Sequence, residues 1–368
     1  MSVQAVYSTN KSVKDAVKEL ANKIDIQNPK LILFFASSNY QPTELSSEFK
    51  NTFKSSEVIG CTTAGEIVSG KMLSNSVVAM VFDKATIGDL KVEVIENLRQ
   101  NPDVDPAFKN FEIHFGESMG EMDYQKYLGL VLIDGLSGSE EKLMEMIGTR
   151  SNLNFVGGSA GDDLKFKQTF VFANGKSYTN AAVLVLLKPL ADFDIIKTQS
   201  FAVMKDKFTA TKVDVEKREV IEFNNMPAIE AYSKAVAKTT ENASTEFMTY
   251  PFGVMVGDEP FVRSPQQVSG KGIKFYCNIV EGTELTLLRS GDIVEETKNV
   301  LAKKIAEVKK ISGLINFNCI LRTLELQNKN QTEAYGKLFE DIPTIGFSTY
   351  GEEYIGHINQ TAVMVVFK

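Results

Sequence analysis

One short motif occurs three times in this chain, and its repetition limits the folds that the sequence can adopt. The copies read IGCTTAGE at residues 59–66, VGGSAGDD at 156–163 and IGFSTYGE at 345–352. Each copy, called a glycine motif below, ends an apolar run, contains glycines and hydroxyl side chains, and closes with a carboxylate. Three copies of an eight-residue motif indicate a repeated structural unit.

The surroundings of the glycine motif repeat as well. An apolar run precedes each copy at nearly the same distance, at residues 31–36, 128–133 and 318–324. Another apolar run follows each copy, at residues 77–82, 181–187 and 362–367. We predict a repeated unit of strand, helix, strand, glycine turn and strand, and hence an α/β fold in which mixed β-sheets are flanked by helices.

The length of 368 residues predicts two packed domains rather than one. Residues 1–24 contain a first amphipathic helix, with Ser12 as its N-cap. We expect one domain over residues 25–222 and a second over residues 223–368, because the polar-apolar alternation before residue 222 gives way to a helix opened by Pro227. A long helix is expected over residues 292–311.

The composition excludes several classes of partner. A net charge of −7 argues against nucleic acid or an anionic membrane as the main partner, because both require a basic face. No stretch resembles a secretory signal, and the apolar runs are too short to cross a bilayer, so a cytoplasmic location without membrane insertion is expected. The odd number of isolated cysteines, Cys61, Cys277 and Cys319, indicates reduced thiols.

The glycine motifs are the first candidate binding site. Glycine turns at strand ends let backbone amides approach the carboxylate or phosphate of a ligand. The candidate ligand-binding side chains are Thr62, Thr63, Glu66, Ser159, Asp162, Ser348, Thr349, Tyr350 and Glu352. The alternative is that the glycines serve backbone geometry alone and that each acid accepts amides of its own turn. None of the three copies is a P-loop, because the lysine is missing, and none is a G-x-G-x-x-G motif in the required context, so nucleotide binding is only weakly indicated.

Two arginines inside apolar segments are the second candidate. Arg263 follows Phe261 and Val262, and Arg322 follows Ile320 and Leu321. An arginine is costly to bury without a partner, and its guanidinium fork suits a carboxylate. Each arginine can therefore pair with an internal acid or bind the carboxylate of a ligand.

Haem, metal and catalytic sites are the remaining alternatives. His114 and His357 are the only imidazoles, so zinc is not expected, and His357 is the candidate haem ligand. Cys61, or a hydroxyl of a glycine motif, could be the nucleophile of a hydrolase or transferase. No histidine lies near Cys61 in the sequence, and the other copies carry Gly158 and Phe347 at its position, so we predict that the chain is not an enzyme.

Taken with residues 250–254, 261–263, 318–322 and 359–361, the three glycine motifs resemble the FIST family over nearly the whole chain. The resemblance implies an N-terminal and a C-terminal FIST domain and a sensory role. Members are thought to bind small ligands, with amino acids proposed, and some are described as haem-dependent nitric oxide sensors. Many are fused to output modules, so a chain of this length would need a separate histidine kinase, cyclase or chemotaxis component as its partner.

The sequence therefore predicts a two-domain ligand sensor without a cofactor, with a haem-binding nitric oxide sensor as the alternative. In this hypothesis the ligand carboxylate is held by Arg263 or Arg322, and its amine by Glu352 or Glu66. Binding then changes the packing between the two halves, and a partner protein detects that change.

Overall fold

The computed structural model describes residues 3–368, and the chain divides into two compact units. The first unit contains the chain up to Thr198 together with residues 297–357 and 362–368, and the second contains residues 199–296 and 358–361. The expected boundary between residues 222 and 223 therefore lies inside the second unit. The chain end belongs to the first unit because β26 (Ala362–Phe367) pairs with β13 (Phe193–Thr198).

Among residues 3–368, three six-stranded sheets involve the first unit. The first sheet is β1 (Val3–Ser8), β6 (Val77–Phe82), β2 (Leu31–Ser37), β3 (Glu57–Thr63), β10 (Val171–Ala173) and β11 (Lys176–Tyr178). The second is β25 (His357–Ile358), β24 (Glu352–Tyr354), β9 (Phe155–Ser159), β8 (Leu128–Ile133), β12 (Ala181–Pro189) and β7 (Ile87–Glu96). The third is β13, β26, β22 (Gly313–Cys319), β23 (Thr344–Thr349), β4 (Glu66–Val68) and β5 (Lys71–Leu73).

The three sheets share one pattern of pairing. A parallel pair forms the centre of each sheet, and these pairs are β2 with β3, β8 with β9, and β22 with β23. An antiparallel strand, β6, β12 or β26, lies on the other side of the first member. On the far side of the parallel pair, the second strand of each pair bonds to a short strand that comes from the chain after another sheet's glycine motif. These pairs are β3 with β10, β9 with β24, and β23 with β4. Each glycine motif thus lies at the end of the second parallel strand, and the exchanged strands connect the sheets.

One expected strand is wrong. The sequence predicted a strand over residues 318–324, but β22 ends at Cys319 and the helix α7 (Ile320–Asn328) begins directly after it. The apolar run continues across this junction, so its composition does not mark where the strand ends. The mixed sheets flanked by helices are confirmed, and β2 is buried at all seven of its residues, as expected for a strand covered on both faces.

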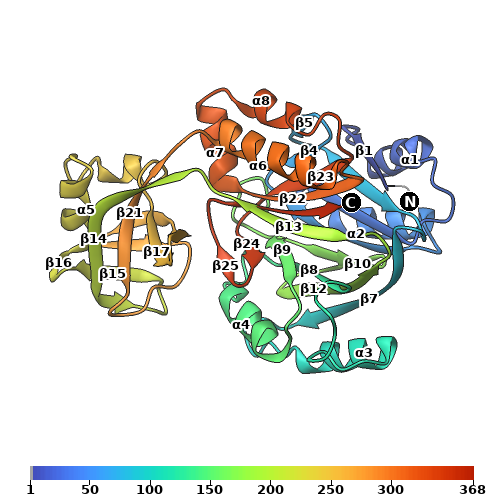
Figure 1. Ribbon diagram of the computed structural model, residues 1–368, viewed down its shortest axis with the longest axis horizontal. Helices are drawn as coiled ribbons and strands as arrows, with labels where there is room; N and C mark the ends of the chain where they lie inside the picture. Colours follow the sequence, from blue (N-terminus) through green and yellow to red (C-terminus); the bar gives the residue numbers. More distant parts are fainter. Residues whose placement is uncertain (1–2) are drawn as a thin grey trace. The chain divides into compact units, whose positions relative to one another are not determined.

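Helices pack on the sheets and enclose separate cores. α1 (Val13–Lys23) and α2 (Pro42–Thr52) pack on the first sheet, where the rings of Phe34 and Phe49 stack with centroids 4.1 Å apart. The Ser12 side chain caps α1, as predicted, by accepting the backbone N–H of Asp15 at 3.3 Å. α3 (Asp105–Phe115) and α4 (Glu140–Arg150) share a core with β8 and β12, beside which Figure 1 shows them. The remaining helices of this unit are α7, α8 (Thr332–Lys337) and most of α6 (Ile293–Val308).

The second unit is built on an antiparallel sheet around an aromatic core. Its strands are β14 (Phe201–Asp214), β15 (Glu219–Phe223), β16 (Met226–Pro227), β17 (Phe252–Val256), β18 (Glu259–Arg263), β19 (Pro265–Ser269), β20 (Gly272–Phe275) and β21 (Glu284–Ser290). The helix α5 (Ala228–Ala235) and a 3₁₀ turn at Ala243–Glu246 complete it. The rings of Phe223 and Phe252 lie 5.1 Å apart at the centre of the core. In the part of the chain that the structure describes, no helix is long and apolar enough to cross a membrane.

Candidate functional site

The three glycine motifs lie at the carboxyl ends of the parallel strands β3, β9 and β23, where ligands often bind in α/β sheets. They also contact one another. The backbone hydrogen bonds between them include Gly161 N–H to the Thr62 carbonyl at 2.9 Å, Ser159 N–H to the Gly351 carbonyl at 2.9 Å and Ala64 N–H to the Ser348 carbonyl at 3.2 Å. The motifs therefore lie together, but many of their backbone hydrogen-bonding groups already bond to one another and join the sheets.

The first glycine of each motif is explained by close packing. A Cβ atom at Gly157 would lie 1.6 Å from the carbonyl oxygen of Val131, and one at Gly60 would lie 2.1 Å from that of Phe34. At Gly346 the corresponding distance to a backbone oxygen is 2.3 Å. These glycines let neighbouring parallel strands approach, which supports the alternative that backbone geometry selects them.

In the first motif, the polar side chains bond within the protein. The buried Glu66 accepts hydrogen bonds from Ser76 Oγ at 2.5 Å and from the Thr63 hydroxyl. Burial raises the pKa of Glu66 to about 8, against the opposing effect of these hydrogen bonds. The hydroxyl of Thr62 accepts the backbone N–H of Phe170 at 2.9 Å. A carboxyl group that keeps its proton at neutral pH is a poor partner for the ammonium group of a ligand.

In the second motif, Asp162 organises its own loop. Its carboxylate accepts the backbone N–H groups of Phe166 at 2.9 Å and Lys167 at 2.6 Å. Tyr350 of the third motif donates its hydroxyl to the same carboxylate at 2.6 Å, so the structure brings these two predicted residues together. Ser159 Oγ donates to Glu353 Oε1 at 3.3 Å.

In the third motif, Thr349 and Glu352 are held by the surrounding backbone and sheet, whereas Ser348 contacts a helix. Thr349 Oγ1 donates to the Gly351 carbonyl at 2.6 Å, and Glu352 is buried on β24 opposite Gly158. Ser348, in contrast, lies 2.8 Å from the hydroxyl of Thr323 at the start of α7. That contact connects the third motif to Arg322.

Arg322 is a buried cation whose side-chain partners in the described chain are uncharged. It is 2% exposed, and among residues 3–368 no carboxylate forms an ion pair with it. Its Nε donates to Asn318 Oδ1 at 3.0 Å, and its Nη2 donates to Thr297 Oγ1 at 3.1 Å. Its Nη1 has no hydrogen-bond partner within the described residues. The guanidinium carbon also lies 5.9 Å from the centroid of the Tyr335 ring. A buried guanidinium whose partners are all uncharged is unusual in a protein interior.

Asn318 connects Arg322 to the third glycine motif. Its Nδ2 donates to Thr323 Oγ1 at 3.0 Å, and Thr323 contacts Ser348. Tyr335 Oη also donates to Asn318 Oδ1, at 3.1 Å. Asn318, Thr323 and Tyr335 were not among the residues predicted for the site. The available signal was an asparagine at the end of a strand whose other residues are almost all apolar.

Arg263 lies in the second unit, on β18, so it belongs to a different unit from Arg322. It is half-buried, and its Nη1 donates to the carbonyl of Val262 at 3.1 Å. This contact with its own neighbour does not identify an anion site.

His357 is packed too tightly to favour haem. Its Nδ1 lies 2.9 Å from Glu353 Oε1, and a Cβ atom at Gly351 would meet the imidazole Cε1 at 2.0 Å. Burial opposes protonation, but the Glu353 carboxylate raises the pKa of His357 above its usual value. His114 is at the surface, 3.0 Å from Asp89. Within residues 3–368 no cluster of three potential metal ligands occurs, and these surroundings do not fit an iron porphyrin.

Cys61 lies inside β3 and is fully buried. Burial raises the pKa of its thiol well above the usual value, so the reactive thiolate is disfavoured. The side chains of Cys277 and Cys319 are also buried. The surroundings of Cys61 are not those of an activated nucleophile.

Residues 30–226 match the FIST N domain, and residues 228–354 match the FIST C domain. The chain belongs to the FIST family. FIST domains are associated with the sensing of small ligands in signal transduction. Together the two matches cover the stretches from which the resemblance was inferred, except residues 359–361.

One relative is an uncharacterized protein of Methanocaldococcus jannaschii. It is 21% identical over 332 residues, which cover 83% of this FIST chain and 63% of the relative. The chain therefore spans less than two thirds of the length of that relative.

Proposed function

We propose that this FIST protein is a sensor of an amino acid or a similar small carboxylate, and that it acts without catalysis of its own. The observation that carries the proposal is Arg322, a buried guanidinium with no carboxylate partner and one unpaired nitrogen among residues 3–368. A ligand carboxylate would supply both the missing charge and the missing hydrogen-bond acceptor. The energetic cost of burying the cation would then be recovered only in the bound state.

The surrounding polar groups support a ligand with more than one polar end. Thr323 and Ser348 provide hydroxyls within the same hydrogen-bonded network as Arg322. Of the two acids considered for the ammonium group, Glu66 has a pKa raised to about 8. Glu352 belongs to the same glycine motif as Ser348, and on that ground we assign the role to Glu352.

The contact between Arg322 and Thr297 suggests how binding could be reported to a partner. Thr297 lies on α6, the helix along which the chain passes from the second unit at Glu296 into the first unit. A carboxylate that attracts the guanidinium competes with Thr297 for it. The bound state would then differ at α6, and a separate histidine kinase, cyclase or chemotaxis component would recognise that difference.

A thermal-shift screen against free amino acids, related carboxylates and haemin tests the proposal. A ligand at one hundred times its dissociation constant stabilises the protein by roughly 2.7 kcal/mol, which is readily detected. We expect a shift with at least one carboxylate ligand, and its loss in Arg322→Met. Arg150→Met is the matched control, because Arg150 is a surface arginine paired with Asp105.

Two outcomes decide against this assignment. If Arg322→Met binds the ligand as tightly as the parent protein, then Arg322 is not the carboxylate site, and Arg263→Met becomes the next variant. If haemin alone produces a shift, with an absorbance band that His357→Ala removes, then the haem alternative replaces the carboxylate sensor.

A further inference from the structure

The strand β13 has a free edge. It lies at the end of the third sheet and pairs with β26 on one side, with no strand on its other side among residues 3–368. The Lys368 N–H donates to the Asp192 carbonyl at 2.9 Å, so this residue pair is of the hydrogen-bonded type. Hydrogen-bonded and non-hydrogen-bonded pairs alternate along an antiparallel ladder, so the backbone groups of Phe193 and Ile195 point away from β26.

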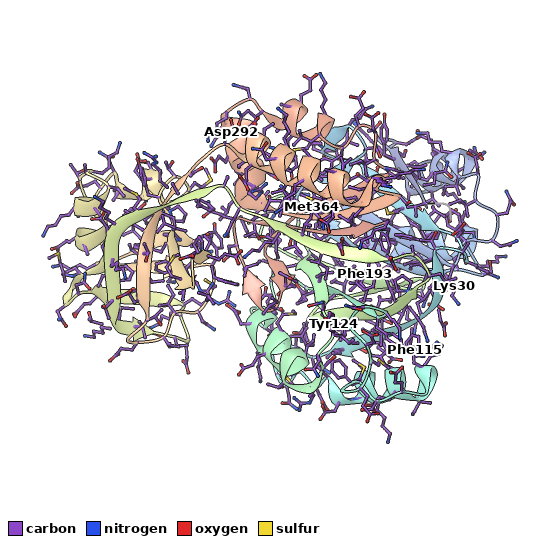
Figure 2. All side chains as sticks on the ribbon, in the orientation of Figure 1. Lys30, Phe115, Tyr124, Phe193, Asp292 and Met364 are labelled. Atoms are coloured by element: carbon purple, nitrogen blue, oxygen red, sulfur yellow. The ribbon has the colours of Figure 1, made fainter. Side chains whose placement is uncertain are left out.

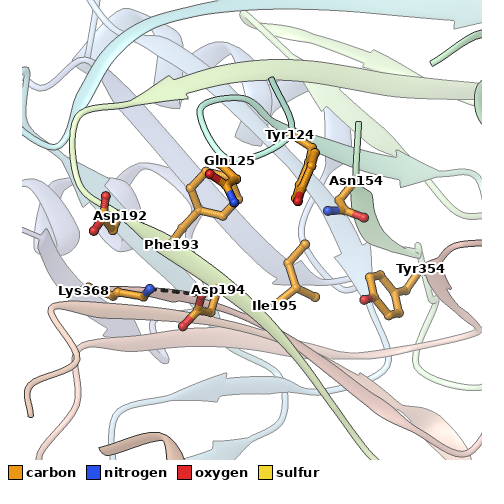
Figure 3. Close-up of a pocket in the computed structure, with 9 residues that line it drawn as sticks. All are labelled: Tyr124, Gln125, Asn154, Asp192, Phe193, Asp194, Ile195, Tyr354 and Lys368. Carbon is orange, nitrogen blue, oxygen red and sulfur yellow. Dashed lines mark ion pairs between the residues drawn. The ribbon is translucent and has the colours of Figure 1, made fainter. Parts of the chain in front are cut away.

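A cavity of about 440 Å³ lies beside this edge. Phe193 and Ile195 line it from β13, as Figure 3 shows. Tyr124, Gln125, Asn154 and Tyr354 line it from other segments of the first unit, and Figure 2 labels Tyr124 and Phe193 on the ribbon. The volume is within the range of ligand pockets, roughly 300–1,000 Å³. The amides and phenol oxygens that line it suit a partner with many hydrogen-bonding groups.

The charges of the cavity are not balanced. Asp194 lies 3.1 Å from the Nζ of Lys368, the ion pair drawn in Figure 3, and its other oxygen lies 3.1 Å from the Nζ of Lys304. Asp192 is exposed and forms no ion pair within the described chain. The cavity therefore presents one uncompensated carboxylate at the end of a strand edge with unpaired backbone groups.

We infer that this cavity binds an extended peptide segment of a partner protein, which adds a strand to β13 and places a lysine or arginine beside Asp192. Strand addition uses the unpaired backbone groups of an edge strand for affinity and nearby side-chain pockets for specificity. The inference concerns a site other than Arg322 and does not depend on the proposed ligand.

The test uses short synthetic peptides. The probe is acetyl-Thr-Val-Lys-Val-Thr-amide, and a second peptide replaces its lysine with glutamate. Two further versions carry N-methyl groups on alternate amides, so that each blocks one edge of the peptide strand. Binding is followed by NMR through the amide resonances of Phe193 and Ile195 in the intact protein.

We expect the lysine peptide to shift both resonances and one N-methylated version to bind at least about five-fold more weakly, since each lost hydrogen bond is worth about 1 kcal/mol. The other N-methylated version should bind like the parent peptide. Asp192→Asn should weaken binding, whereas Asp258→Asn, at an exposed carboxylate of the second unit, should not. Ile195→Pro should fold normally, because the lost N–H faces away from β26, but should not bind.

Several results overturn the inference. Equal binding of both N-methylated peptides excludes strand addition, and equal binding of the glutamate peptide excludes the role of Asp192. Failure of every peptide to shift the two resonances excludes the site. If glucose shifts these resonances and the peptides do not, the cavity takes a small polar molecule instead.

Discussion

Replacing Glu66 by glutamine removes a buried carboxyl group that titrates in the folded protein. Burial raises the pKa of Glu66 to about 8, whereas the usual value for glutamate, and hence for the unfolded chain, is 4.5. The folded state therefore keeps a proton that the unfolded state releases throughout this interval. Unfolding is then favoured as the pH rises, so Glu66 lowers the stability progressively from about pH 4.5 to about pH 8.

The size of the effect follows from the difference between the two pKa values. Each pH unit in the interval corresponds to about 1.4 kcal/mol, so the whole interval corresponds to about 5 kcal/mol, as an order of magnitude. Glutamine resembles the neutral carboxyl group in shape and can still bond to Ser76 and Thr63. We expect Glu66→Gln to be about as stable as the parent protein at pH 5 and several kcal/mol more stable at pH 9.

The measurement is urea unfolding of both proteins at a series of pH values between 5 and 9. The difference between the two free energies of unfolding isolates Glu66, because all other titrating groups are common to both proteins. Glu121→Gln is the control, since Glu121 is an exposed glutamate and the substitution makes the same change of side chain at the surface. If the difference for Glu66→Gln is independent of pH, or if the parent protein gains stability relative to it as the pH rises, then Glu66 is ionised when folded and the reasoning is refuted.

Three further predictions follow from single residues. Arg322→Met should leave the stability of the ligand-free protein unchanged or raise it by up to about 2 kcal/mol in urea unfolding, because a buried unpaired charge is removed; a large loss of stability would contradict this. Gly157→Ala should lower the free energy of unfolding by about 3 kcal/mol or more, measured in a thermal melt, because the new Cβ would overlap the Val131 carbonyl. Gly148→Ala is the control: Gly148 lies in a helix with open space around it, so this change should raise the free energy of unfolding by about 0.5–1 kcal/mol. Cys61 should react with a thiol reagent only after unfolding, as mass spectrometry of labelled peptides would show; rapid labelling of the native protein would reopen the nucleophile hypothesis.

The sequence predicts the elements of the fold better than their connections. The runs at 77–82 and 362–367 coincide with β6 and β26, because a wholly apolar strand is recognisable from composition. The pairing of β4 with β23, far along the chain, had no sequence signal. Short hairpin strands carry little periodicity, and many strand edges could accept them, so only the complete tertiary structure specifies which edge they join.

The division into units illustrates a different limit. The sequence places a boundary near residue 223, where the local pattern changes, and the two family matches meet close to that position. The chain instead leaves the first compact unit after Thr198 and returns to it within α6. A continuous helix shows no break in its periodicity where the chain passes between units, so pattern analysis does not detect this passage.

Only part of the candidate site could be predicted from the sequence. Arg322 follows an apolar run and its guanidinium is buried, whereas Arg263, which also follows apolar residues, is only half-buried, so the sequence pattern alone does not separate the two. The partners of Arg322 could not be inferred, because Thr297 and Asn318 come from α6 and β22 and meet Arg322 only after the chain has folded. That no carboxylate of residues 3–368 pairs with Arg322, on which the proposed function depends, is likewise a property of the tertiary structure.

Comparison of the three glycine motifs indicates where a ligand should be sought first. In the first motif the carboxyl group of Glu66 is held by neighbouring hydroxyls, and in the second Asp162 binds the amides of its own loop. The third motif differs, because Ser348 is linked through a hydrogen-bonded network to Arg322, whose Nη1 has no partner in residues 3–368. A buried donor without an acceptor costs roughly 1–3 kcal/mol, and a bound carboxylate would remove that cost. The equivalent strand ends thus differ in their surroundings, and the third motif is the one linked to the unpartnered guanidinium nitrogen of Arg322 in the described residues.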